Sequence, residues 1–276
     1  MAMNSINTNS QALIALPSFN GTNSQLGVAQ KRVSTGYRVA DAKDDGGAFA
    51  VAQAVRSDVA GVIAVGEQLG GVKGILQTSF AALSVVSDTM KQIRAVLTRL
   101  ADAAISSDQR VTYQDQYKLL AEQVASFVDD ALYNGRTLLS IDTANGGDIT
   151  AIRDETGGTF TIKAVDGENL NLEEDAPTDA ATATIWIKSN GEFDNVDKAI
   201  SAALNEFGAA MTFVENQLKY NSQKVDALET GLGALVDADI AKESSTLEAL
   251  KVRQQLSVQT LGLANQGPQV LLGLFR

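Results

Sequence analysis

Residues 51–104 read VAQAVRSDVAGVIAVGEQLGGVKGILQTSFAALSVVSDTMKQIRAVLTRLADAA. Apolar residues recur in this stretch at alternating spacings of four and three, and only Asp58 and Ser79 interrupt the series. This period predicts one long helix. At about 1.5 Å per residue such a helix would be roughly 80 Å long, which exceeds the width of a compact domain. The expected fold is therefore mainly α, an elongated antiparallel helical bundle or coiled coil formed by the N- and C-terminal regions of the chain.

Two further stretches carry the same helical period. The first runs from Tyr113 to Ala131, and we expect it to stop at residues 133–135, with Gly135 as its C-terminal cap. The second runs from Ile200 to Leu235 and contains one polar member, Asn221, of the kind that fixes the register of packed helices.

Residues 141–195 differ in character from the helical stretches. Segments 159–165 and 182–188 alternate with period two and are rich in Thr and β-branched residues, and glycine turns separate them. This pattern predicts two strands in a small inserted β-rich module. The module has a net charge of −9, so we expect it to face solvent.

The two ends of the chain are the most unusual part of the sequence. Residues 1–40 and 251–276 contain no Asp or Glu, although the whole chain has 33 acids against 22 bases. Each end also has two apolar stripes at helical spacing, where a helix in an ordinary monomer needs only one. A helix with two stripes needs two neighbours, and the residues alone leave open whether the second neighbour is another part of the same chain or another copy of it. Pro17 is expected to kink the N-terminal helix or reset its start. Pro268 is expected to interrupt the C-terminal helix in the same way.

Composition excludes several classes of function. The chain has no His and no Cys, which removes the usual general base, the commonest metal ligand, thiolate chemistry and disulfides. We predict a protein that is not an enzyme, with no catalytic residue, no cofactor and no metal; the acidic residues Asp41, Asp44 and Asp45 fit a solvated loop better than a cation site. The sequence has no dense basic patch of the kind that binds nucleic acid, so we expect no nucleic-acid partner. We also expect neither a cleavable signal nor a membrane-spanning stretch.

The terminal motifs resemble those of bacterial flagellins in the order in which that family carries them. They are SINTN (residues 5–9), KRVSTGYRV (31–39), AKDD (42–45), NGRTLL (134–139), LVDADIAKES (235–244), QQL (254–256), ANQ (264–266) and LLGLFR (271–276). The resemblance covers about residues 1–140 and 196–276.

The resemblance implies a structural subunit that polymerises into the bacterial flagellar filament used for swimming. It implies three regions: terminal helices that form the inner core of the filament (1–40 and 236–276), a helical coiled-coil rod (41–140 and 196–235) and a small acidic β-rich surface module (141–195). Implied partners are other copies of the chain, the flagellar export apparatus with a secretion chaperone, and the hook-associated and cap proteins, with no nucleic acid and no membrane. The implied location is the extracellular filament, reached by export without a cleaved signal.

The residues expected to drive polymerisation lie in the terminal helices. They are Ile6, Leu13, Leu16, Phe19, Leu26, Val33, Leu247, Leu250, Val252, Leu256, Leu261, Leu263, Val270, Leu271, Leu274 and Phe275.

Residues 90–96 resemble the segment that Toll-like receptor 5 recognises in many flagellins. Arg94 is kept, but Gln92 stands where immunostimulatory members have a second Arg, and Ala95 stands where they have Glu. A glutamine cannot replace the charged fork of an arginine, so we expect a degenerate receptor segment in which Ile93 and Leu97 serve as helix core.

Two alternative functions share some of these features. A hook-filament junction protein of the flagellum has similar terminal helices, but the ending LLGLFR favours a flagellin. A secreted, helical, membrane-active translocator would need a longer apolar segment than any in this chain.

Overall fold

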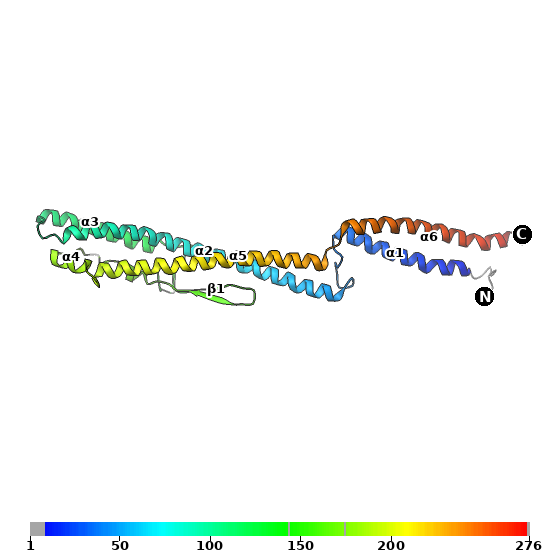
Figure 1. The fold of residues 1–276 in the computed structure, drawn as a ribbon, viewed down its shortest axis with the longest axis horizontal. Helices are drawn as coiled ribbons and strands as arrows, with labels where there is room; N and C mark the ends of the chain where they lie inside the picture. Colours follow the sequence, from blue (N-terminus) through cyan, green and yellow to red (C-terminus); the bar gives the residue numbers. More distant parts are fainter. Residues whose placement is uncertain (1–8, 143, 174, 275–276) are drawn as a thin grey trace. The chain divides into compact units, whose positions relative to one another are not determined.

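The computed structural model describes residues 9–142, 144–173 and 175–274, with side chains to residue 266. The described chain is mainly α (Figure 1). Its elements, in order, are α1 (Ser10–Thr35), α2 (Gly46–Leu100), α3 (Ser107–Asp129), β1 (Ile149–Ile152), β2 (Thr159–Ile162), the 3-10 helix η1 (Gly167–Leu170), α4 (Ala180–Ile187), α5 (Glu192–Val236) and α6 (Ile240–Leu274).

The chain divides into two compact units. The first comprises the residues up to Ser57 together with those from Ala227 onward, and the second comprises Asp58–Asp226. The long helices α2 and α5 contribute to both. The expected three-part division into core, rod and surface regions concerns the arrangement in a filament, and it stays a prediction.

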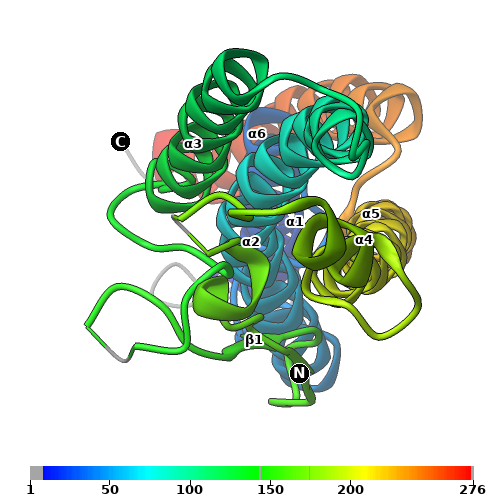
Figure 2. The same ribbon diagram turned by 90° about the vertical axis from the view of Figure 1, so that its left-hand side faces the viewer.

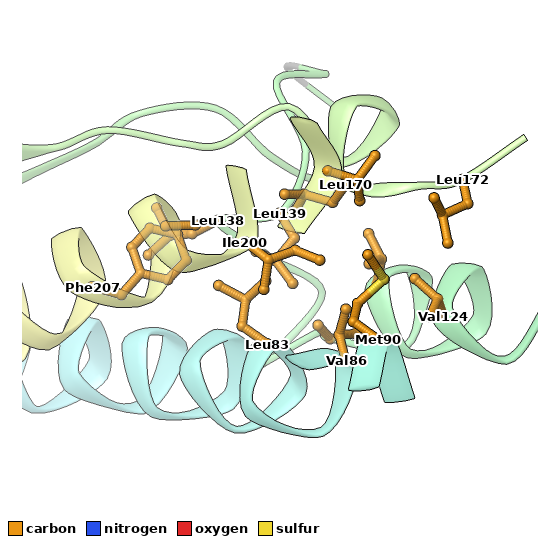
Figure 3. Close-up of a cluster of buried hydrophobic side chains, with 14 of the residues drawn as sticks. Leu83, Val86, Met90, Val124, Leu138, Leu139, Leu170, Leu172, Ile200 and Phe207 are labelled. Atoms are coloured by element: carbon orange, nitrogen blue, oxygen red, sulfur yellow. The ribbon is translucent and has the colours of Figure 1, made fainter. Parts of the chain in front are cut away.

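The second unit is built around the long helix predicted from residues 51–104. The apolar series of α2 is buried from Leu69 to Leu100, and α3 and α5 pack against it around one core (Figures 1 and 2). Figure 3 shows Leu83, Val86 and Met90 of α2 facing Ile200 of α5 and Val124 of α3. Ile93 and Leu97 are fully buried in this core, as expected. The periodic pattern therefore predicted both the helix and the face that it buries.

The polar residue Ser79 interrupts the apolar series of α2 for a structural reason. Its side chain is fully buried, and its hydroxyl accepts a hydrogen bond of 3.4 Å from the backbone N–H of Leu138. Leu138 and Leu139 belong to the loop after α3 and fill the core between α2 and α5 (Figure 3). Ser79 thus ties this loop to α2, since a buried N–H without a partner would be unfavourable.

Two expected features between α3 and α5 are wrong. Helix α3 ends at Asp129, and Gly135 does not cap it; Gly135 lies in a later turn, with a φ of 76°, where Tyr133 and Arg136 pair as an isolated bridge. The glycine supplies the left-handed conformation that this turn requires.

The strand predicted over residues 182–188 is the second wrong feature, because this segment forms α4. The carboxylate of Asp179 accepts the N–H of Thr182 at 2.7 Å as an N-terminal cap. Ala183 and Trp186, three positions apart, are buried while Ile185 is 60% exposed. The N-terminal cap and the burial of residues at helical spacing stabilise a helix here, although the sequence alternates with the period of a strand.

The other predicted strand is present. β2 pairs antiparallel with β1, with Ile149 opposite Ile162 and Ile152 opposite Thr159. Side chains from this inserted region, including Leu170 and Leu172, belong to the same core as α2, α3 and α5 (Figure 3).

Asn221 of α5 holds the turn of this hairpin. Its side chain is 4% exposed, and its amide donates to the carbonyl oxygen of Arg153 at 3.3 Å. Gln217 donates to the same carbonyl at 3.0 Å, and Lys224, one turn beyond Asn221, forms an ion pair with Glu155. The polar insertion in the α5 stripe therefore binds the hairpin backbone.

By length and composition alone, α2 could cross a membrane. One 18-residue window of α2 has a mean hydropathy of 1.5, and 17% of that window is buried. The expectation that no stretch qualifies as a membrane span is therefore not met on these two criteria. One helix that meets these criteria is weak evidence for a span.

Candidate assembly surface

Helices α1 and α6 of the first unit lie side by side and run antiparallel (Figure 1). Asn9 caps α1 by accepting the N–H of Ala12 at 3.1 Å, and its amide also donates to the carbonyl of Ala264 at 2.9 Å. Nearer the other end of α1, Arg32 pairs with Glu243 at 3.0 Å. Polar contacts therefore fix the register of the two helices.

Pro17 does not reset the start of α1. The helix begins at Ser10 and continues through Pro17 to Thr35, and α6 likewise includes position 268. A proline in a helix interior costs about 3 kcal/mol. Half-buried residues of α1 lie on both sides of Pro17, namely Ala12 and Ala15 before it and Phe19 and Leu26 after it.

The segment that follows α1 also pairs with the segment that precedes α6. Gly36 ends α1 in the left-handed conformation with a φ of 75°, and its carbonyl accepts the N–H of Ala238 at 2.8 Å. Tyr37 and Asp237 form an antiparallel bridge. Val39 and Val236 are buried beside it in a small separate core.

The acidic residues after α1 surround a lysine. The ammonium of Lys31 lies 2.8 Å from a carboxylate oxygen of Asp41 and 2.8 Å from one of Asp44. These hydrogen bonds lower the pKa of both carboxyls and raise the pKa of Lys31. This ion pairing gives the cluster a structural role at the end of α1. No group of three or more possible metal-ligating side chains is found in the described part of the chain.

One apolar stripe of each terminal helix faces the other helix. Leu250 is 7% exposed, and the remaining members of this set are half-buried, namely Phe19, Leu26, Val33, Leu247 and Leu261. The structure brings these predicted residues together between α1 and α6.

The second stripe of each helix lies open. Leu13 and Leu16 of α1 are 59% and 46% exposed, and Val252, Leu256 and Leu263 of α6 are 55%, 56% and 66% exposed. Ile6 and Phe275 lie outside the described residues, and the side chains of Val270, Leu271 and Leu274 are also not described.

Several further apolar residues of the same helices, which were not predicted, are also exposed. They are Ile14, Val28, Ile240 and Val258, which are 78%, 41%, 44% and 54% exposed. Ile14 adjoins Leu13, so the exposed stripe of α1 is wider than the predicted one. The adjacent apolar residues Leu13 and Ile14 were the signal in the sequence that the stripe of α1 is wide.

The segment expected to be a degenerate receptor site lies on the outer face of α2. Gln92, Arg94 and Ala95 are exposed. The guanidinium of Arg94 pairs with Asp197 at 3.1 Å and lies over the ring of Phe193, 5.0 Å from its centroid. Arg94 is therefore engaged with α5 of its own chain.

Comparison with known proteins identifies the family. A family model described as the bacterial flagellin N-terminal helical region matches residues 6–143, and one described as the C-terminal helical region matches residues 193–275. The chain belongs to the bacterial flagellin family. The resemblance of the terminal motifs is thereby confirmed, and the function that follows is that of a structural subunit of the flagellar filament.

Curated flagellins of similar length match along the whole chain. Flagellin FljK of Caulobacter vibrioides is 31% identical to this chain over 279 residues. The alignment covers the whole of both chains. A flagellin of Brucella melitensis is 32% identical over 295 residues, covering 99% of this chain and all of the relative. The crystal structure of Bacillus cereus flagellin resembles the fold with a TM-score of 0.51 at 23% identity, over 56% of this chain and 88% of that one.

Proposed function

We propose that this flagellin polymerises by burying the exposed apolar stripes of α1 and α6 between neighbouring copies. The proposal rests on one observation. Each terminal helix uses one stripe against the other helix and leaves a second, with leucines 46–66% exposed, open to solvent. Fully burying such a side chain contributes about 1.5–3 kcal/mol, so several per subunit can drive assembly. A helical polymer forms through contacts between different surfaces of successive copies, which do not close into a ring.

Membership of the flagellin family supports the proposal of further partners. Export by the flagellar apparatus with the help of a secretion chaperone would take the chain to the extracellular filament, where it would contact hook-associated and cap proteins. The role is structural and not catalytic, a proposal supported by the complete lack of His and Cys in the sequence.

A pair of matched substitutions tests the proposed interface. Leu263→Asp places a carboxylate in the exposed stripe of α6, and Ile185→Asp places one on α4; the two native side chains are similarly exposed, at 66% and 60%. Burying an unpaired charge is strongly unfavourable. We expect Leu263→Asp to raise the critical concentration for seeded polymerisation by about 100-fold or more, and Ile185→Asp to leave it nearly unchanged.

Sedimentation of filaments after seeding, at a series of monomer concentrations, measures this difference. Circular dichroism of both monomers controls for folding. If Leu263→Asp assembled as readily as Ile185→Asp, the stripe would not be the interface.

A further inference from the structure

An open groove of about 790 Å³ runs between α1 and α6. Its lining is apolar at Val28, Ala29, Ala249 and Leu250. Hydroxyls of Ser24, Ser245 and Thr246 also line it. A groove of this size can hold several side chains of a neighbouring protein segment.

The charged residues that line the groove are mostly basic. Arg32, Lys242 and Arg253 contribute cations, and the one acid in the lining, Glu243, already pairs with Arg32. Within the described residues, Lys242 and Arg253 form no ion pair. The groove therefore carries two uncompensated cations, and it favours a ligand with negative charge.

A buried donor in the groove also lacks an acceptor. Nε of Arg32 is buried and has no hydrogen-bond partner among the described residues, while Nη1 of the same side chain binds Glu243. Buried polar groups are nearly always hydrogen-bonded in native proteins, so this N–H is a position where an incoming acceptor would be favourable.

We propose that the groove receives a carboxylate-bearing segment of a second copy of this chain. The proposal rests on the proposed function, because it assigns a second surface to the same polymer contact. Ala249 and Arg253 of the groove flank Val252 of the exposed stripe on α6, so a copy that packs on the stripe also reaches the groove. Complementary charge on the two surfaces would fix the register of neighbouring copies and disfavour wrong ones.

The sequence limits where the incoming carboxylate lies. Residues 1–40 and 251–276 contain no Asp or Glu, so these ends of a neighbour cannot supply a side-chain carboxylate. All 33 acids of the chain lie between residues 41 and 250. The neighbour must therefore place part of that range opposite the groove, and the contact cannot consist of the acid-free ends alone.

Charge reversal on one helix tests the groove. Arg253→Glu reverses a lining cation, whereas Lys251→Glu makes the same charge change two residues away, outside the lining, where Lys251 pairs with Glu248 at 2.8 Å and is itself half exposed. We expect Arg253→Glu to raise the critical concentration for seeded polymerisation by about 30-fold or more, because it opposes a carboxylate with a carboxylate. Lys251→Glu should stay within about threefold of the wild type.

Equal assembly of the two variants would overturn the proposal, and so would full assembly of Arg253→Glu at all salt concentrations. A wild-type chain that formed no filaments would instead overturn the proposed function, so the two failures can be told apart.

Cross-linking identifies the occupant of the groove directly. Because the chain has no cysteine, Thr246→Cys offers a unique thiol in the groove for a photoreactive label. The labelled chain is copolymerised at low fraction with isotopically heavy wild-type chain, and cross-linked peptides are mapped by mass spectrometry. We expect heavy peptides from residues 41–250. Cross-links to heavy peptides only from residues 1–40 or 251–276, or no intermolecular cross-link at all, would contradict the proposal.

Discussion

Removal of residues 256–276 is expected to abolish polymerisation and to leave the second unit folded. The deletion takes away Leu256 and Leu263 of the exposed stripe together with the end of α6 that pairs with Asn9. The core of the second unit draws on no described residue beyond Leu218, so its unfolding should not change. Seeded polymerisation followed by electron microscopy should show no filaments at any accessible concentration.

Thermal unfolding of the truncated monomer supplies the control. The midpoint of the main transition should match that of the full chain, and helix content should fall only by the deleted segment. Filaments of normal appearance from the truncated chain would show that the end of α6 is dispensable. A lowered midpoint would show that the second unit depends on it.

Replacement of Phe207 by alanine is expected to destabilise the second unit by about 3–5 kcal/mol. Phe207 of α5 is fully buried and belongs to the core that Leu83, Ile200 and Leu138 also fill (Figure 3). The substitution removes apolar contacts and leaves a cavity that a core supported by long helices cannot readily close. Urea unfolding followed by circular dichroism measures the loss as a lower midpoint with an unchanged slope.

Tyr220→Ala is the matched control for this core substitution. Tyr220 lies on the same helix but is 56% exposed, so its truncation should change the free energy of unfolding by no more than about 0.5 kcal/mol. Similar losses in the two variants would mean that the buried face of α5 has been assigned wrongly.

The long helices could be predicted because their burial repeats. Along α2 one face meets the core at every turn from Leu69 to Leu100, so the sequence repeats with the helical period over many turns. The capping box of Ser106 and Gln109 similarly marks the start of α3 with local chemistry.

The strand prediction overlooked a local helix cap, whereas the roles of Ser79 and Asn221 depend on contacts with distant residues. Residues 182–188 alternate like a strand, yet Asp179 caps them as a helix and Trp186 is buried on one face. Ser79 and Asn221 look like flaws in apolar stripes, but each binds backbone from a distant loop. Hydrogen bonds between residues about 60 or more positions apart have no signature in a single sequence.

The candidate surface was only partly predictable for the same reason. Two stripes on each terminal helix were visible as periodic patterns, and in the structure one is buried or half-buried and the other is exposed. The ties that set the register of α1 and α6, such as Asn9 to Ala264, join residues 255 positions apart. The basic groove likewise depends on Arg32 of α1 and Arg253 of α6 lining the same groove, which spacing along the chain cannot reveal.

Thiol labelling before and after assembly measures directly whether the α6 stripe becomes buried between copies. The lack of cysteine makes Leu263→Cys and Ile185→Cys single reporters on the stripe of α6 and on α4. The measurement compares the rate at which each thiol reacts with a water-soluble reagent in the monomer and in seeded filaments. We expect similar rates for both thiols in the monomer. In filaments we expect the rate at position 263 to fall by about 100-fold or more, while position 185 stays reactive. Undiminished reactivity at position 263 in intact filaments would contradict burial of the α6 stripe between copies.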